Sequence, residues 1–208
     1  NWEAGDIMYA DLNGDGEVNS GNGTLEDTGD LSVIGNSTPR YRFGIDLSGD
    51  YKNFDFRIFL QGFGKRDYMP NGPYFWGANG GMWQSAGFDE HMDFFRDEDS
   101  QMVQAGIAEV NREAYYPRPL FGSGKNQQTQ TRYIQDASYL RVKNVQLGYS
   151  FEAFQKSRVR FYISGENLLT FTDMIDIFDP ESIGLGGWND GKTYPYSQVF
   201  SVGLNVNF

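Results

Sequence analysis

The first chemistry that the residues offer is cation binding, in the acidic segment 11–19. Side chains that carry oxygen recur there at alternate positions: Asp11, Asn13 and Asp15. Such oxygens converge when the chain curls into a loop; Gly16 permits the sharp turn and Glu17 can add its main-chain carbonyl. The twelfth position of such a loop is Asn22, which cannot supply a bidentate carboxylate, so a metal-free loop closed by Asx turns is the alternative. We expect a structural calcium ion or a similar hard cation.

Other reactive groups are scarce. The chain has no Cys, which excludes disulfides and thiolate chemistry, and its single His, His91, excludes zinc sites built from several histidines. His91 lies among acidic residues, where we expect an exposed side chain rather than a catalytic base. No pair of carboxylates stands in an apolar pocket that the sequence reveals, so glycosidase chemistry has no support. We therefore expect no enzymatic activity.

Aromatic residues gather in segments outside the expected strands. Residues 74–83, Trp188 and residues 194–196 could stack on sugar or peptide ligands. The alternative is that they pack the loops or contact a lid protein. Both readings stay open at this stage.

Composition restricts the class of protein. The 208 residues include 17 Lys and Arg against 28 Asp and Glu, and the resulting charge of −11 argues against nucleic acid as a partner. No apolar run of about 18 residues occurs, so we expect no transmembrane helix. The first ten residues do not resemble a signal peptide. Aromatic residues make up 16% of the chain and Gly is abundant, a composition typical of outer-membrane barrels.

Strict alternation of apolar and polar residues predicts an all-β fold. It runs through residues 41–48, 54–61, 159–164 and 200–208. A further segment, 139–151, changes phase once, and one extra residue near Lys143 and Asn144 would restore it, as a β-bulge does. With that bulge, no charged residue falls on the apolar face of any of the five expected strands.

The connections alternate in length. Residues 49–53 and 152–157 form short turns, whereas residues 63–137 and 170–197 form long segments. In an antiparallel sheet, all short connections then lie at one end and all long ones at the other. Outer-membrane barrels have this asymmetry, with short periplasmic turns and long extracellular loops.

A soluble sandwich and part of a barrel wall both explain alternating strands. The bulky apolar faces, the opposite faces with charges of both signs, and the aromatic residues near the short turns favour the barrel. These aromatic residues are Tyr51, Phe54, Tyr149, Phe151 and Phe154. Five strands cannot close a barrel, for which about eight are needed, so the chain would be one part of a larger wall. The last residue, Phe208, would end an aromatic terminal strand.

The chain resembles the carboxy-terminal part of SusC/RagA-family TonB-dependent transporters of Bacteroidetes. The resemblance runs in order through GDIMYADLNGDG (5–16), VIGNST (33–38), YKNFDFRIFLQG (51–62), ASYLRVKNVQLGY (137–149), VRFYISGENLLTFT (159–172), residues 179–181 and residues 194–208. The insert at 20–29 and the loops depart from it.

This resemblance implies a barrel of about 22 strands with an amino-terminal plug. Residues 1–208 would supply its last five antiparallel strands and would lack the plug, the TonB box and the signal peptide. Residues 1–39 would form an extracellular loop with the candidate calcium site, and residues 63–137 a long extracellular loop. The stretch 29–35 looks like the family segment that follows this loop, so Asp30 would close the calcium site, with Glu26 and Asp27 as rivals.

The function implied is energised import of a bulky nutrient, such as a glycan or peptide, across the outer membrane. The barrel wall would contact lipid and the remainder of its own barrel, and its loops would contact the ligand and a SusD-like lipoprotein lid. A TonB complex would act through the plug. The alternative is a secreted, calcium-stabilised β-domain for adhesion or glycan binding.

Overall fold

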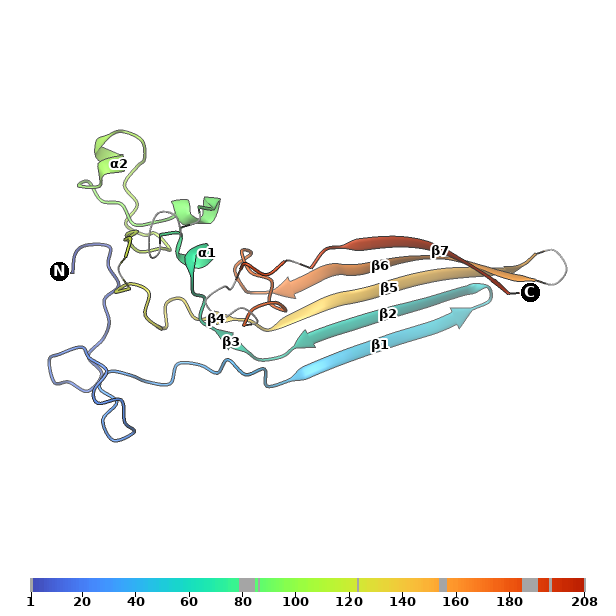
Figure 1. Ribbon diagram of the computed structural model, residues 1–208, viewed down its shortest axis with the longest axis horizontal. Helices are drawn as coiled ribbons and strands as arrows, with labels where there is room; N and C mark the ends of the chain where they lie inside the picture. Colours follow the sequence, from blue (N-terminus) through green and yellow to red (C-terminus); the bar gives the residue numbers. More distant parts are fainter. Residues whose placement is uncertain are drawn as a thin grey trace. The chain divides into compact units, whose positions relative to one another are not determined.

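Five long strands form one antiparallel sheet in the order β1-β2-β5-β6-β7 (Figure 1). The computed structural model describes residues 2–78, 85, 87–122, 124–153, 157–184, 191–194 and 196–207. The strands are β1 (Arg42–Tyr51), β2 (Phe54–Phe63), β5 (Tyr139–Glu152), β6 (Arg158–Thr172) and β7 (Val199–Asn207). All five strands expected from alternation are present, and each has 9–15 residues. This length reaches the roughly 9–11 residues that a transmembrane strand needs. Phe208 lies outside the described residues.

The chain divides into two compact units. The sheet unit comprises Asn36–Tyr68, Ile134–Gly187 and Thr193–Phe208, and the loop unit comprises Asn1–Gly35, Met69–Tyr133 and Trp188–Lys192. Within the sheet unit, the β1–β2 and β5–β6 connections lie at one end of the strands, and the long segments leave from the other end (Figure 1). The predicted asymmetry of the connections is therefore present in the sheet.

The turn between β1 and β2 is shorter than predicted. Residues 49–53 were expected to form it, but Tyr51 pairs with Phe54, so only Lys52 and Asn53 remain in the turn. Lys52 has a φ of 55°, in the left-handed region that non-glycine residues rarely adopt. The ladder runs farther than alternation predicts, and it includes Asp50 and Asp55, which stand opposite each other in register.

The predicted bulge in β5 is confirmed. Phe59 and Leu60 of β2 stand opposite Asn144 and Val142, which leaves Lys143 as the extra residue. A bulge of this kind returns the apolar residues on both sides of it to one face.

A second irregularity, in β6, was not predicted. Asn144 pairs with Glu166, and Val142 pairs with Leu169. Between these pairs β5 has one residue and β6 has two. One of the two, Asn167, has a φ of 52°. At this point β6 has two residues more than β2. Because two is an even number, the apolar residues of β6 before and after the irregularity stay on the same face. For that reason the sequence pattern could not reveal it.

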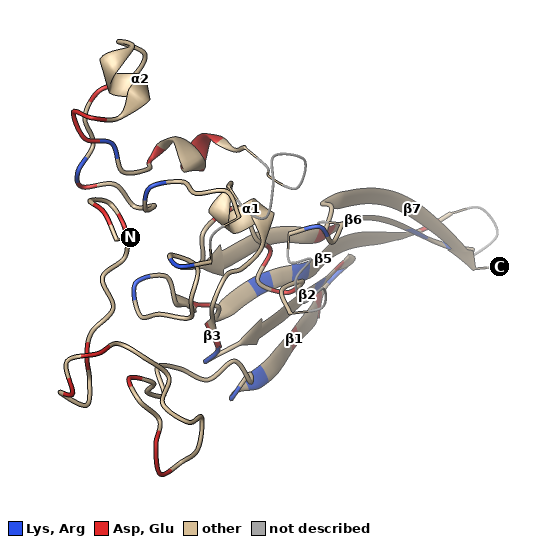
Figure 2. Ribbon diagram, turned by 60° about the vertical axis from the view of Figure 1, so that its left-hand side comes forward, with Lys and Arg blue, Asp and Glu red and all other residues tan. Residues whose placement is uncertain are grey.

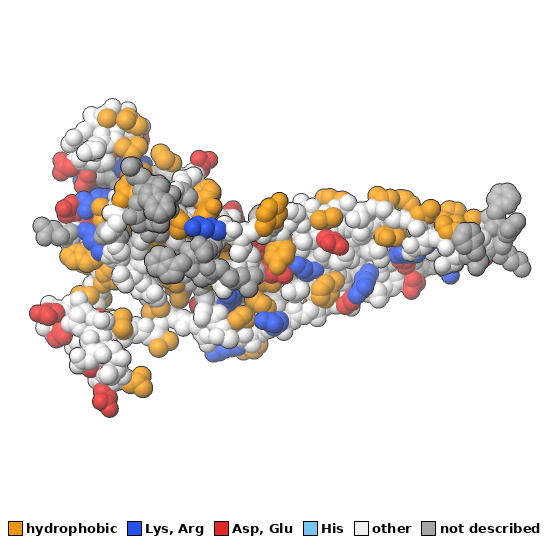
Figure 3. Space-filling view, in the orientation of Figure 1, with side chains coloured by type: hydrophobic (Ala, Val, Ile, Leu, Met, Phe, Trp, Pro, Cys, Tyr) orange, Lys and Arg blue, Asp and Glu red, His pale blue; other side chains and the backbone are white. Residues whose placement is uncertain are grey.

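The sheet has one apolar face, and that face is exposed. On β1, Phe43, Ile45 and Leu47 are 36–50% exposed, and the row Phe200, Val202 and Leu204 on β7 is 61–76% exposed. In a soluble sandwich these residues would form the core. Large exposed apolar surfaces mark contact with another protein or with lipid. Figure 3 shows the acidic and basic side chains that the strands carry.

The buried residues of the sheet unit lie next to the strands. A two-stranded ribbon, β3 (Asp67–Tyr68) with β4 (Gln135–Asp136), packs with the segment that follows β6. The Tyr68 and Phe178 rings are 6.1 Å apart, and Ile175 N donates to Gln135 Oε1 at 3.0 Å. Within the sheet unit, the start of the long β6–β7 connection therefore packs against the β3–β4 ribbon.

The loop unit is held by an aromatic cluster. Its short elements are α1 (Pro73–Trp76), the 3₁₀ turn η2 (Asp89–Met92) and α2 (Gln101–Gln104). The Phe75 ring lies 5.4 Å from Tyr116 and 5.6 Å from Tyr133, and all three side chains are buried. Among the described residues, no helix has the length and apolar character needed to cross a membrane.

Candidate functional site

The face of the sheet opposite the apolar one carries paired charges. Arg57 donates to both carboxylate oxygens of Asp46, with Nε–Oδ1 at 3.0 Å and Nη2–Oδ2 at 2.5 Å. Arg160 of β6 makes the same two-pronged contact with Asp55 of β2. Such bidentate pairs fix orientation more strongly than single contacts do. These two ion pairs therefore order part of the polar face, and within each pair the charges neutralise each other.

The Arg160–Asp55 pair reaches across the strand between its two partners. That strand is β5, which has Gly148 opposite Asp55. A Cβ at Gly148 would lie 2.4 Å from the Asp55 carboxylate and 2.6 Å from the Arg160 guanidinium. On β7, a Cβ at Gly203 would lie 2.2 Å from the Tyr162 ring. Two glycines thus leave the space that the larger polar-face side chains occupy.

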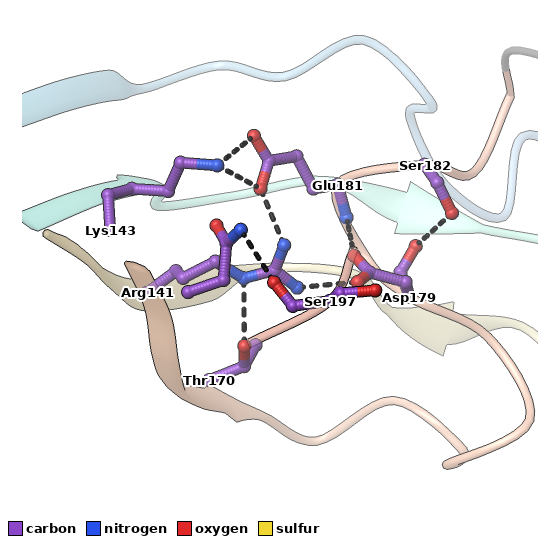
Figure 4. Close-up of polar contacts among 8 residues, drawn as sticks. Arg141, Lys143, Thr170, Asp179, Glu181, Ser182 and Ser197 are labelled. Atoms are coloured by element: carbon purple, nitrogen blue, oxygen red, sulfur yellow. Dashed lines mark hydrogen bonds and ion pairs between the residues drawn. The ribbon is translucent and has the colours of Figure 1, made fainter. Parts of the chain in front are cut away.

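The most buried charged cluster on this face is centred on Arg141 of β5. Its side chain is 3% exposed and donates to Glu181 and Asp179 at 2.7 Å each and to Thr170 Oγ1 at 2.8 Å (Figure 4). Lys143 Nζ lies 3.1 Å from the second Glu181 oxygen. Two cations and two carboxylates therefore neutralise each other where water is largely excluded.

A short turn delivers both carboxylates to Arg141. Ser182 N donates to the Asp179 carbonyl at 3.0 Å, which closes a β-turn with Pro180 at its second position. Asp179 Oδ1 also accepts the Glu181 N–H at 2.9 Å, an Asx turn. Because the turn is held locally, the two side chains leave it together toward the strand, as Figure 4 shows.

Tyr196 adds an aromatic wall to the cluster. Its ring centroid lies 5.4 Å from the Arg141 guanidinium and 4.8 Å from Lys143 Nζ, within cation–π range. The cluster contains no nucleophile beside a base. Its geometry suits an anchor that holds both ends of the β6–β7 connection against the polar face.

The sequence reading did not assign this cluster. It placed Arg141 and Lys143 on the polar face, and it noted residues 179–181 only as part of the resemblance. The available signal was two cations at a strand bulge and an Asp-Pro-Glu turn in a long loop. To predict that these cations pair with this turn, one must know the strand register and the path of the long loop. Neither can be read from the local sequence.

The predicted calcium residues lie in one loop, where the structure gives their oxygens hydrogen-bond partners. Asp11 accepts the N–H groups of Gly14 and Gly16 at 2.6 and 2.8 Å, and Asn13 Oδ1 accepts that of Asp15 at 2.9 Å. Asp15 accepts the Glu17 N–H at 2.8 Å. Figure 2 shows the acidic residues of this segment in red.

Asp30 contacts this loop through hydrogen bonds from the loop's main chain. Its oxygens accept the N–H groups of Leu12 at 2.6 Å and of Asn19 at 2.7 Å. These bonds from Asn19 and Leu12 hold the pKa of the Asp30 carboxyl below its usual range. In the part of the chain that the structure describes, no three His, Cys, Asp or Glu side chains are arranged to hold a metal ion. The hydrogen bonds seen are those of the Asx-turn alternative.

The aromatic segments divide between packing and exposure. Phe75 and Trp76 are buried in the loop unit, so they follow the packing alternative, and the Tyr74 and Phe88 rings lie 5.4 Å apart in a stacked arrangement. Tyr194 is 88% exposed. Trp83, Trp188 and Phe154 lie outside the described residues.

The expectation of an exposed His91 is wrong. Its ring is half-buried, Nδ1 accepts the Phe88 N–H at 3.0 Å, and Nε2 lies 3.0 Å from the Phe75 carbonyl. Since a carbonyl can only accept, Nε2 carries the proton and the ring is neutral. The imidazole serves as a link between α1 and η2.

Comparison with curated proteins gives likenesses over almost the whole chain. No family model matches. The chain is 31% identical over 224 residues to TonB-dependent receptor P3 of Formosa agariphila, covering 99% of this chain and 19% of the relative. It is 24% identical to TonB-dependent receptor SusC of Bacteroides thetaiotaomicron, covering 97% of this chain and 17% of the relative. The chain therefore spans about a fifth of the length of these relatives.

Solved structures show the same fold. The structure described as the RagAB peptide importer in the open-open state matches with a TM-score of 0.60 and 25% identity, over 88% of this chain and 18% of that chain. The closed-closed state matches with a TM-score of 0.59 and 24% identity, over the same shares.

The relatives are receptors and importers, in agreement with the expectation of a chain without enzymatic activity. They also favour a barrel wall over a secreted β-domain. The two-faced antiparallel sheet and these likenesses identify the chain as a β-barrel segment of the SusC/RagA family of TonB-dependent receptors.

Proposed function

We propose that this chain forms part of the wall of an outer-membrane transporter that imports a bulky nutrient, a glycan or a peptide, in a TonB-dependent manner. The observation that carries the proposal is the two-faced sheet. One face exposes bulky apolar side chains along five long strands, and the other carries paired charges. A lipid-facing exterior and a wet interior are the two environments that a transmembrane barrel supplies.

The long segments would lie on the extracellular side. These include residues 1–39 and 63–137, which precede and follow the first hairpin. The Arg141 cluster would hold part of a third long connection on the interior side of the wall. In this arrangement, the anchored segment shapes the passage beside the strands while the other long segments meet the ligand.

The partners follow from the resemblance. A SusD-like lipoprotein would cover the long segments, and a TonB complex would act through the amino-terminal plug that the resemblance implies. The likeness to the structure described as a peptide importer supports a peptide as one class of cargo, whereas the lid is implied by the family resemblance alone. Outer-membrane lipid would surround the apolar face.

A deletion strain tests this function. The full gene is removed and restored on a plasmid, and growth is measured on neutral oligosaccharides and on peptides as sole carbon source. The expected result is loss of growth on one class, restored by the wild-type gene and not by a copy with a disabled TonB box. Equal growth of all strains on every source would contradict the proposal.

A further inference from the structure

Alternation does not fix the register of β7 against β6. The polar-face residues at the centre and end of β7 are Ser201, Gly203, Asn205 and Asn207, and the residues between them are all apolar. A slip of one residue would exchange the two faces, whereas a slip of two residues keeps each residue on its face. The ladder also repeats every two residues, so such a slip costs hydrogen bonds only at its ends. Other contacts must therefore select the observed register.

The place of β7 in the sheet gives this register a consequence. β7 lies at one edge of the sheet, with β6 as its neighbour (Figure 1). A slip of two residues would displace the strand by about 7 Å, at about 3.3 Å per residue. The other edge of β7, which a further strand of the barrel would pair with, would move by the same amount. This consequence rests on the proposed barrel, whereas the register itself does not.

One contact that depends on register is a glycine covered by an aromatic ring. Tyr162 of β6 stands opposite Gly203, and a Cβ at Gly203 would lie 2.2 Å from the Tyr162 ring. The Arg160 guanidinium lies 4.9 Å from the centroid of this ring and is itself held by both oxygens of Asp55. Turning the ring away from Gly203 would therefore disturb a cation–π contact with an anchored arginine.

The sequence of β7 offers the Tyr162 ring one position only. Gly203 is the single glycine of the strand. After a slip of two residues, Tyr162 would face Ser201 or Asn205, and the Cβ of either residue would enter the space that the ring occupies. The glycine therefore distinguishes registers that alternation leaves equivalent.

Two side-chain hydrogen bonds hold the start of β7 to the irregularity in β6. Asn167 Nδ2 donates to the Ser197 carbonyl at 3.1 Å, and Gln198 Nε2 donates to the Leu168 carbonyl at 2.7 Å. Each side chain thus bonds to the main chain of the other segment. A slip of two residues would carry Ser197 and Gln198 about 7 Å along β6 and break both bonds.

We propose that Gly203, Asn167 and Gln198 together set the register of β7 on β6. Gly203 admits the Tyr162 ring at one position, and the two side-chain bonds fix the point at which the strand begins. The irregularity of β6 then has a role, because it supplies Asn167 and the Leu168 carbonyl to the segment that enters β7.

The experiment reads the register with pairs of cysteines in the intact transporter, in outer membranes, under mild oxidation. Ile163 faces Val202, and after a slip of two residues toward the short turns it would face Phe200. Opposite residues lie about 5 Å apart and diagonal ones about 7–8 Å, near or beyond the roughly 7 Å limit for a disulfide. In the observed register, Ile163→Cys should therefore cross-link with Val202→Cys and not with Phe200→Cys. The transporter without these cysteines is the background control.

Two pairs of substitutions together should move the register. Ser201→Gly with Gly203→Ser moves the space for the Tyr162 ring by two residues. Asn167→Gly with Gln198→Ala removes both side-chain bonds, and glycine tolerates the φ of 52° at position 167. In the variant that combines all four, we expect the cross-link to pass from positions 163 and 202 to positions 163 and 200. Asn167→Gly with Gln198→Ala alone is the matched control and should keep the first cross-link, because Gly203 still admits the ring.

A second measurement applies if the combined variant does not assemble. Gly203→Ser alone should lower the assembled fraction, measured by heat-modifiable migration in gels. In a Tyr162→Ala background the same substitution should have no further effect, because the ring that it meets is gone.

A cross-link that stays at positions 163 and 202 in the combined variant would overturn the proposal, as would full assembly of Gly203→Ser. The growth experiment on the deletion strain is independent of these outcomes. Lost growth on deletion together with an unmoved register would reject the role of Gly203, Asn167 and Gln198 and leave the transport function standing.

Discussion

Arg141 shows how much one buried charge can organise. Its guanidinium joins β5 to a turn 38–40 residues later in the chain. Removing one partner of a buried ion pair costs about 3–5 kcal/mol, because the other charge is left without compensation. We expect Arg141→Gln to release the segment that follows β6. The measurement is hydrogen exchange in the intact transporter, where the amides of Ser182 and Ile183 should lose protection.

Arg158→Gln is the control for this prediction, because Arg158 is an exposed arginine at the start of β6. It should leave the exchange of both amides unchanged. Equal protection in Arg141→Gln and the wild type would show that the anchor lies elsewhere.

The Asp6 carboxyl should make the stability of the loop unit depend on pH. Burial raises the pKa of its carboxyl, but hydrogen bonds from Lys125 and Asn126 outweigh this and hold the pKa below the usual range. A lowered carboxyl pKa stabilises the fold above the unfolded value of about 3.9, and this stabilisation is lost as the pH falls through the folded pKa. We expect faster proteolysis of residues 2–9 at pH 3 than at pH 7. Asp6→Asn should be cleaved readily at both values.

Calcium binding by Asp11, Asn13, Asp15, the Glu17 carbonyl and Asp30 stays a prediction. We propose that millimolar calcium slows proteolytic cleavage within residues 11–30 of the intact protein, since ligands at about 2.3–2.6 Å would tie the loop together. The double variant Asp11→Asn with Asp15→Asn should lose this protection. Cleavage that is equally slow with calcium and with a chelator would contradict calcium binding and show that the Asx-turn network alone holds the loop.

At the scale of elements, β7 provides a test of the two faces. Leu204 is 61% exposed on the apolar face, and an arginine at the membrane midplane costs about 2–4 kcal/mol. We expect Leu204→Arg to reduce assembly of the barrel, measured by heat-modifiable migration in gels. The adjacent polar-face residue Gly203 cannot serve as the tolerant control, because the Tyr162 ring occupies the space of its side chain.

Ser201 replaces Gly203 as the control for this prediction. It pairs with Ser164 of β6 and is exposed on the polar face. Ser201→Arg should assemble nearly as well as the wild type. Equal assembly of Leu204→Arg and Ser201→Arg would show that the assignment of the faces is wrong.

At the scale of the whole molecule, the alternation of short and long connections predicts the orientation in the membrane. These 208 residues contain no Cys, so a single cysteine introduced among them can report on one side of the membrane, with the transporter without that cysteine as the background control. We expect Leu25→Cys, in the first long segment, to react with a membrane-impermeant maleimide on intact cells. Asn53→Cys, in the exposed two-residue turn, should react only after the cells are opened. Labelling of both positions in intact cells would contradict the proposed orientation.

Alternation in the sequence is enough to predict the five strands, their two faces and the bulge at Lys143. These properties are local, because period-two alternation reports the side of a sheet on which each residue lies. The resemblance adds the expectation that Asp30 closes the cation site of the acidic loop, which stays a prediction. The irregularity at Asn167 stayed hidden, since two extra residues in β6 restore the phase that one would break.

Which polar residues contact one another depends on the tertiary structure. Arg141 finds Asp179 and Glu181, and Tyr162 finds the space above Gly203, through the register and the path of a long loop. The same holds for His91: its acidic neighbours in sequence predict exposure, whereas its contacts in the fold come from the Phe75 carbonyl and the Tyr116 ring. Alternation constrains each strand alone, but contacts between distant side chains depend on how the strands and loops are packed together.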